Sequence, residues 1–158
     1  SSQTIKNQNA FYLPAGDGKI SFVDARDVAA VAVEVLTNNG SRHLNKVYDI
    51  TGPQALSHDQ VAEILSEETD RRISYVDISE EVARNEMKKM GVANWFIDNA
   101  MELYNMYKSG SRSQITNVVE QLTGRGPISF SQFARNYVQN GLSWPNQERT
   151  LTGWSKFE

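Results

Sequence analysis

The sequence contains no cysteine among its 158 residues, and it contains only two histidines. Without cysteine there is no disulfide framework, no thiol nucleophile and no zinc site built on sulfur. The histidines, His43 and His58, do not stand at the spacing of a metal-ligand pair with carboxylates, so metal and catalytic-triad chemistry are disfavoured. No apolar run approaches the ~20 residues that span a bilayer, and no signal peptide is visible, so we expect a cytoplasmic protein without a membrane partner.

The sequence also lacks an excess of basic residues. Lysine and arginine total 16 against 19 acidic residues, which gives a formal net charge of -3. Because nucleic-acid binding depends largely on cations that neutralise phosphates, this balance argues against a nucleic-acid partner. A hydrophobic content of 39% and a mean hydropathy of -0.51 are typical of a globular protein, and the length favours one domain. The chain starts at Ser1 without methionine, in a polar run, which suggests a piece of a longer protein.

The most informative stretch, residues 13–36, combines a turn, a short strand and a helix. Pro and Gly at 14, 16 and 18 predict the turn, and the apolar run at 20–24 predicts a strand. Asp24 is expected to cap the helix, with Asp27 near the positive end of the helix dipole. Asp17, Asp24 and Asp27 could form an acid/base cluster, but turn formation and capping explain them better. Helical spacing predicts one apolar stripe made by Val28, Val31, Ala32, Val35 and Leu36.

Two more strand-and-helix units follow, and then the pattern becomes helical. Runs at 46–51 and 73–78 predict the second and third strands. Ser57 with Gln60 forms a capping box, and a serine at 79 begins the next helix. Beyond Gly91 the sequence predicts three helices, the second capped by Asn117 and the third by a box at 129–132. This order predicts an α/β fold with three short strands and a helical C-terminal half.

Three segments of the sequence resemble NmrA-like atypical short-chain dehydrogenases. They read GDGKISFVDARDVAAVA at 16–32, KVYDITGPQALSHDQVAEIL at 46–65 and LTGRGPISFSQF at 122–133. The resemblance covers about residues 11–142 and implies the C-terminal, substrate-side part of a Rossmann-like fold. It divides the chain into a polar lead-in at 1–10, a substrate-side domain at 11–144 and a polar tail at 145–158.

The cofactor fingerprint of that family is absent from the sequence. Its Gly-rich loop should follow a strand and begin a helix, whereas the only candidate here, GDGKIS at 16–21, leads into a strand. The resemblance therefore implies NAD or NADP in the full-length protein and no cofactor bound by this chain alone. Tyr104 and Lys108 have the spacing of the family's Tyr-x-x-x-Lys pair, although a core tyrosine and a solvated lysine is the better interpretation.

The resemblance leaves two functional classes open. The first is an NAD(P)-dependent oxidoreductase that acts on a small carbonyl or quinone-like substrate, and the second is a non-catalytic NAD(P) sensor that works through a protein partner. A free-standing α/β interaction module is a third interpretation. For the oxidoreductase we expect no catalytic or metal residue in this chain, a missing N-terminal nucleotide-binding half as partner, and self-association. The expected substrate-binding residues are aromatic: Phe11, Tyr12, Trp95, Phe96 and Tyr104.

Overall fold

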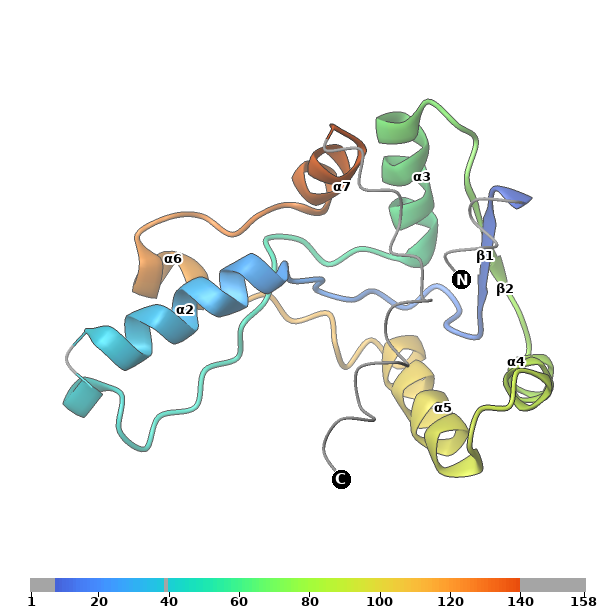
Figure 1. Cartoon of the computed structure of the whole chain (residues 1–158), viewed down its shortest axis with the longest axis horizontal. Coiled ribbons are helices and arrows are strands. Elements are labelled where there is room, and N and C mark those ends of the chain that lie inside the picture. Colours follow the sequence, from blue (N-terminus) through green and yellow to red (C-terminus); the bar gives the residue numbers. More distant parts are fainter. Residues whose placement is uncertain (1–7, 39, 140–158) are drawn as a thin grey trace, which may run out of the picture.

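The computed structural model describes residues 8–38 and 40–139 and has a mixed α/β fold (Figure 1). Residues 1–7 and the expected polar tail at 145–158 lie outside the described residues. The α/β class expected from the sequence is confirmed. In chain order the elements are β1 Ala10–Leu13, α2 Ala25–Thr37, the 3-10 helix η1 Gly40–Arg42, α3 His58–Thr69, β2 Ser74–Asp77, α4 Glu80–Lys89, α5 Asn94–Lys108, α6 Val118–Thr123 and α7 Phe130–Gln139.

The sheet has two parallel strands, with β1 and β2 in register from Ala10 opposite Ser74 to Leu13 opposite Asp77. The strand expected at 73–78 is therefore confirmed, and residues 11–13, expected only as an entry to the turn, belong to a strand. The strands expected at 20–24 and 46–51 are wrong. Residues 20–24 make a single bridge, between Ile20 and Leu56, and residues 46–51 form no strand in the described chain.

The error at 46–51 has a physical cause. Strand propensity reflects packing against cross-strand neighbours more than a preference of the backbone itself. Within the described chain this run has no neighbouring strand to complete its hydrogen bonds, and the Val47 side chain is 91% exposed. The run at 46–51 thus has the residue pattern of a strand, but no strand in the described chain pairs with it.

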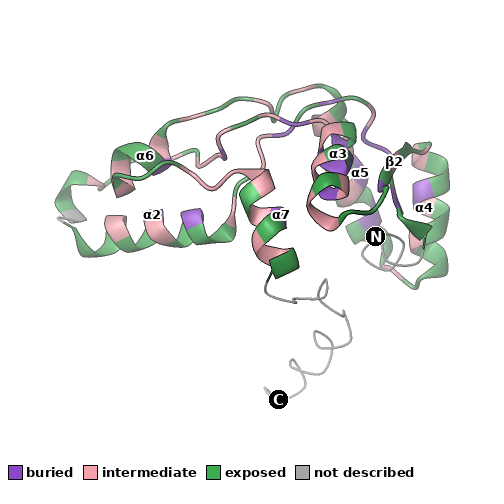
Figure 2. Cartoon of the chain, turned by 90° about the horizontal axis from the view of Figure 1, so that it is seen from above, coloured by how far each residue is buried: buried purple, intermediate pink, exposed green. Residues whose placement is uncertain are grey.

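The core consists of two clusters that lie on the side of the molecule opposite to α2 (Figure 2). In the larger cluster α3 packs against α7 and against the sheet. In the smaller cluster α5 packs against α4 around Ile97 and Met101. The buried members of the larger cluster are Phe11, Leu56, Val61, Ala62, Leu65, Ile73 and Ala134.

Side-chain caps begin most of the helices at the positions expected from the sequence. The Asp24 carboxylate accepts from the Arg26 amide at 2.8 Å, and Ser57 forms a complete capping box with Gln60. These bonds satisfy amides that the first helical turn leaves without partners. Asn117 is an exception, because it precedes α6 but its side chain makes no capping bond. The other confirmed serine caps are Ser79, which precedes α4, and Ser129, which precedes α7.

Helix α2 carries the expected apolar stripe, but most of that stripe is uncovered. Val31 is 3% exposed on this helix, which contacts α6, whereas Leu36 is 81% exposed. Figure 2 shows exposed and half-buried residues along most of α2. The helix therefore presents apolar side chains that nothing in the described chain covers.

Candidate functional site

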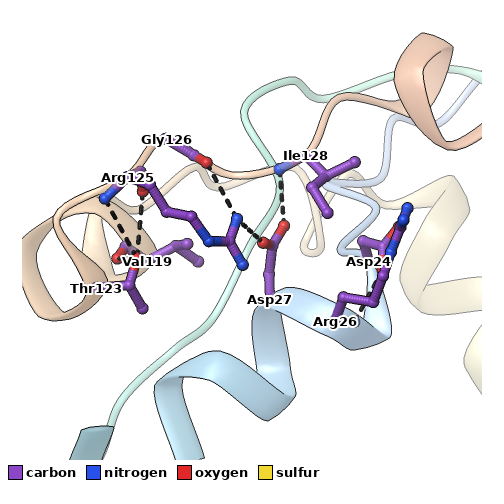
Figure 3. A network of polar contacts seen from close by, with 8 residues as sticks. All are labelled: Asp24, Arg26, Asp27, Val119, Thr123, Arg125, Gly126 and Ile128. Carbon is purple, nitrogen blue, oxygen red and sulfur yellow. Dashed lines mark hydrogen bonds and ion pairs between the residues drawn. The ribbon is translucent and has the colours of Figure 1, made fainter.

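A fully buried carboxylate joins helix α2 to the segment between α6 and α7 (Figure 3). The Asp27 side chain is 0% exposed. It accepts from the Arg125 guanidinium at 2.6 Å and from the Ile128 amide at 2.7 Å. Because both oxygens of the carboxylate are bonded, Asp27 fixes the loop between α6 and α7 against the start of α2.

The side chain of the neighbouring Asp24 makes its hydrogen bonds within the start of α2. Besides capping α2, its carboxylate binds the Arg26 guanidinium through two hydrogen bonds of 2.9 and 2.7 Å. The Arg26 hydrogen bond holds the pKa of the Asp24 carboxyl below its ordinary value. Asp24 and Asp27 are thus each committed to structural bonds, and the capping interpretation of Asp24 is confirmed. Asp17 is exposed in the turn after β1 and makes no contact to either of them.

Three segments that are distant in the sequence line an open cavity of ≈ 360 Å³ at the surface. They are the residues after the Gly-rich turn, the run that follows Tyr48, and the C-terminal part of α5 with its following loop. The lining is a mixture of apolar, hydroxyl and charged side chains. It comprises Ile20, Ser21, Asp49, Ile50, Thr51, Leu103, Tyr107, Ser111, Arg112, Gln114 and Thr116.

Two glycines allow these segments to approach so closely. A Cβ atom on Gly18 would lie 1.9 Å from the Tyr107 carbonyl oxygen, and one on Gly52 would lie 1.8 Å from the Phe22 carbonyl oxygen. Both obstructions are backbone atoms, which cannot move aside as a flexible side chain can. Glycine is therefore required at both positions, because any other residue would separate the segments around the cavity.

Hydrogen bonds fix the cavity wall. The Arg112 carbonyl accepts from the Ser21 amide at 2.9 Å and from the Ser21 hydroxyl at 3.1 Å. The Thr116 amide donates to the Thr51 hydroxyl at 2.9 Å, and the Thr116 hydroxyl donates to the Asp49 carbonyl at 2.6 Å. The hydroxyl groups of the lining are thus largely used to hold the loop after α5 against the two other segments.

The other polar side chains of the lining do not hold the cavity wall together. In the described part of the chain, the side chains of Asp49, Tyr107 and Gln114 make no hydrogen bond, and Arg112 contacts only the Met106 sulfur, at 3.3 Å. Burial raises the pKa of the Tyr107 hydroxyl, and the positive charge of Arg112 opposes that rise. Asp49, Arg112 and Gln114 are exposed, so their polar groups face solvent and can also bind a ligand. The half-buried Tyr107 hydroxyl is available in the same way.

The five expected substrate-binding residues lie in different surroundings. Phe11 is buried in the larger core cluster and contacts the Tyr75 ring at 5.4 Å. Trp95 and Phe96 are exposed at the start of α5, with ring centroids 5.7 Å apart. Tyr12 is exposed on β1, and Tyr104 is half-buried beside the Tyr107 ring. Among these five, ring contacts join only Trp95 and Phe96, and their role with substrate stays a prediction.

The sequence pattern alone does not identify the residues that line the cavity, although two signals point toward them. Tyr107 follows Tyr104 on the aromatic face of α5, but that face was interpreted as core. Gly18 and Gly52 each lie next to the loops that form the cavity, so close backbone approach was a usable clue. The hydrogen bond from the Gly16 amide lowers the pKa of the Asp77 carboxyl, and the Lys108 charge adds to this effect. Lys108 thus acts on Asp77, and no hydrogen bond joins it to Tyr104 within the described residues.

Both histidines lie beside tyrosine side chains. The His43 Nδ1 atom lies 2.9 Å from the Tyr48 hydroxyl. His58 is buried among aromatic rings, and burial lowers its pKa. Its Nδ1 atom has no hydrogen-bond partner in the part of the chain that the structure describes. Residues 8–38 and 40–139 contain no group of three or more side chains that could bind a metal ion. Within the same ranges no helix has the length and apolarity needed to cross a membrane.

A family model and several known proteins match most of this chain. The model of the NmrA-like family matches residues 2–136. The NAD(P)H azoreductase of Xenophilus azovorans is 41% identical over 137 residues, which cover 87% of this chain and 47% of that protein. Festuclavine synthase II of Penicillium roqueforti is 36% identical over 137 residues, which cover 86% of this chain and 47% of that protein. The chain spans about half the length of the curated relatives it matches.

Comparison with solved structures supports the same fold. The NADPH-dependent quinone oxidoreductase of Escherichia coli, solved with NADPH, matches with a TM-score of 0.77 and 23% identity, over 87% of this chain and 48% of that one. The triphenylmethane reductase of Citrobacter sp., solved with NADP(H), matches with a TM-score of 0.73 and 25% identity, over 85% and 46% of the two chains. The Rossmann-like class of the neighbours agrees with the fold expected from the sequence.

Proposed function

Because the chain belongs to the NmrA-like family, we propose that it is the substrate-side part of an NAD(P)-dependent oxidoreductase that reduces a small carbonyl or quinone-like molecule. The relatives include an azoreductase that uses NAD(P)H and a quinone oxidoreductase that uses NADPH. In this proposal the nicotinamide cofactor supplies the hydride, and the present residues supply the walls of the substrate site. The cofactor itself is bound by a separate nucleotide-binding half.

The observation that carries the proposal is the ≈ 360 Å³ cavity. A volume of this order lies at the lower end of the range for small-molecule sites, which are concave and combine apolar walls with a few polar groups. The apolar side chains of Ile20, Ile50 and Leu103 suit a carbonyl or quinone ring. The Tyr107 hydroxyl, which has no partner in the described chain, is a donor for a substrate oxygen.

The uncovered surface of α2 supports the proposed nucleotide-binding partner. Val28, Val33 and Leu36 are exposed on this helix, and Val47 is exposed in the unpaired run at 46–51. An unpaired run of strand-forming residues beside an apolar helix is a suitable surface for a sheet supplied by another domain or by a second copy of the chain. We propose that the nucleotide-binding half covers it and that self-association covers it when that half is absent.

The proposal is tested with the natural reading frame that encodes this chain, expressed whole and compared with the 158 residues alone. We expect the whole product to oxidise NADPH when naphthoquinone is added, and the isolated chain to bind neither NADPH nor NADH with micromolar affinity in isothermal titration. Micromolar binding by the isolated chain would contradict the division into halves. NADPH binding by the whole product without turnover of any carbonyl or quinone would favour the sensor.

A matched pair of leucine substitutions tests whether the cavity is the substrate site. Leu103→Ala removes an apolar wall of the cavity and should raise KM for naphthoquinone roughly tenfold, since a lost isobutyl contact is worth about 1–3 kcal/mol. Leu44→Ala makes the same change at an exposed position outside the lining and should leave KM unchanged. Equal KM values in both variants would count against the cavity.

A further inference from the structure

We propose that the cavity selects a small planar molecule that carries one anionic oxygen group, a carboxylate or a sulfonate, and that Arg112 is the residue that binds this group. The inference rests on the proposed function, because it names the class of substrate for the same cavity. It concerns selectivity rather than the chemical step. It can therefore fail while the proposed oxidoreductase function stands.

The first argument is the state of the Arg112 side chain. Arg26, Arg84, Arg125 and Arg135 each form an ion pair with a carboxylate. Arg112 forms none in the described ranges, and neither do Arg42 and Arg72. Arg112 differs from these two in lining the cavity, where its Nη2 atom contacts only the sulfur of Met106. A thioether is a weak acceptor and leaves most of the donors of the guanidinium unused. A guanidinium with unused donors on a cavity wall matches the two oxygens of a carboxylate or sulfonate.

The second argument is that the backbone of Arg112 is fixed. Two hydrogen bonds from Ser21 end on its carbonyl oxygen, so the base of the side chain cannot drift away from the cavity. The guanidinium also lies near enough to Tyr107 for its charge to act on the phenol. Because its backbone is held, Arg112 loses less conformational entropy when it binds an anion than an arginine on a loose loop does.

The third argument limits the charge of the ligand. Asp49 lines the same cavity, and it forms no ion pair with Arg112 or with any other cation of the described chain. Its carboxylate repels a second anionic group and accepts from a hydroxyl or amine of the ligand. The wall therefore fits a ligand with a single anionic group and a hydrogen-bond donor, held between the apolar side chains of Ile50 and Leu103.

Binding to the 158-residue chain is the direct test, followed by NMR chemical-shift changes so that millimolar dissociation constants are measurable. The probes are para-hydroxybenzoate and its uncharged analogue para-hydroxybenzamide, at low ionic strength. We expect the anion to bind roughly 5- to 10-fold more tightly, as for a charge-assisted hydrogen bond with partial exposure to solvent. Arg112→Gln should abolish this preference, Arg112→Lys should keep part of it, and Asp49→Asn should increase it.

Arg42→Gln is the matched control, since Arg42 lies in η1 outside the cavity lining and its loss removes the same charge. A preference of equal size in Arg42→Gln and in the unaltered chain supports the inference. A preference that survives in Arg112→Gln, or equal binding of the two probes to the unaltered chain, overturns it. So does the absence of any shift at the cavity residues with either probe.

Turnover by the whole reading frame separates this inference from the proposed function. Naphthoquinone and its monosulfonate differ only in the anionic group. We expect a higher kcat/KM for the sulfonate, and the difference should fall in Arg112→Gln through KM with kcat little changed. Reduction of both quinones at equal kcat/KM would overturn the anion selectivity and leave the oxidoreductase intact. Reduction of neither would contradict the proposed function itself.

Discussion

Removal of the Asp27 carboxylate should detach the loop between α6 and α7 from α2. In Asp27→Ala the Ile128 amide loses its acceptor, and the Arg125 guanidinium keeps only the Gly126 carbonyl at 3.4 Å. The guanidinium can turn toward water, because its side chain is 45% exposed. The amide is part-buried and is left without a protein partner. Loss of the Ile128 hydrogen bond should therefore cost more free energy of unfolding than loss of the Arg125 ion pair.

A hydrogen bond to a charged group is worth about 1.5–3 kcal/mol, and the bond from the Ile128 amide to a fully buried carboxylate belongs in this range. The Arg125 ion pair is half exposed on one side, so solvent screening reduces it to about 1 kcal/mol. We therefore expect Asp27→Ala to lower the free energy of unfolding by about 3 kcal/mol. Asp27→Asn keeps an acceptor for the Ile128 amide and should cost about 1–2 kcal/mol.

Urea titration followed by far-ultraviolet circular dichroism measures these changes. Arg125→Ala and the double variant complete a cycle, in which the pair should show a coupling of about 1 kcal/mol. Asp24→Ala is the internal comparison, since it removes a nearby carboxylate that only caps the helix and binds Arg26. If Asp27→Ala cost no more than Asp24→Ala, the buried carboxylate would not fix the loop and the reasoning would be refuted.

Three further predictions concern stability. Asp24→Ala should cost about 1 kcal/mol, the usual loss of an N-cap, and an unchanged melting temperature would contradict the cap. Gly18→Ala should cost more than about 2 kcal/mol, because its Cβ would meet the Tyr107 backbone, whereas Gly126→Ala meets nothing within 4 Å and is the control in the same urea titration. The pKa of His58 is lowered from 6.5 by burial, against the raising effect of Asp59 and Asp77. Below pH 6.5 the unfolded chain therefore binds a proton at His58 more readily than the folded chain does, so the free energy of unfolding should fall with pH there and be fully retained above pH 6.5. His58→Phe should make the free energy of unfolding less dependent on pH below 6.5.

The local features of the helices were predictable from the sequence, since their determinants lie a few residues apart. Asp24 lies at the end of an apolar run and before a helical stripe, so its cap followed from neighbouring residues. Ser57 and Gln60 have the spacing of a capping box, and the box is present. The parallel pairing of β2 was also accessible in part, because residues 73–78 carry strand-forming side chains, although their partner at 10–13 was not recognised.

The candidate site was not predictable in the same way, because its determinants are long-range. The Asp27 carboxylate and the Arg125 guanidinium are 98 positions apart, and no periodicity links them. The cavity joins residues near 20, near 50 and near 110, and the glycines that bring them together have no signature beyond their own flexibility. The aromatic residues chosen from the sequence were selected by type, whereas the cavity depends on which side of α5 each one faces.

The uncovered apolar stripe of α2 shows both the local and the long-range determinants of the fold. A stripe of this kind normally indicates the face that a helix buries, and the rule correctly selects Val31. The same rule applied to Val28 and Leu36 selects residues that the described chain leaves exposed. Helical periodicity reports that a partner surface is required, but it carries no information about which polypeptide segment supplies it. The run at 46–51 behaves in the same way, since it has the pattern of a strand but pairs with no strand among the described residues. Both patterns agree with the proposed nucleotide-binding half, whose sheet we propose to pack on α2 and to pair with 46–51.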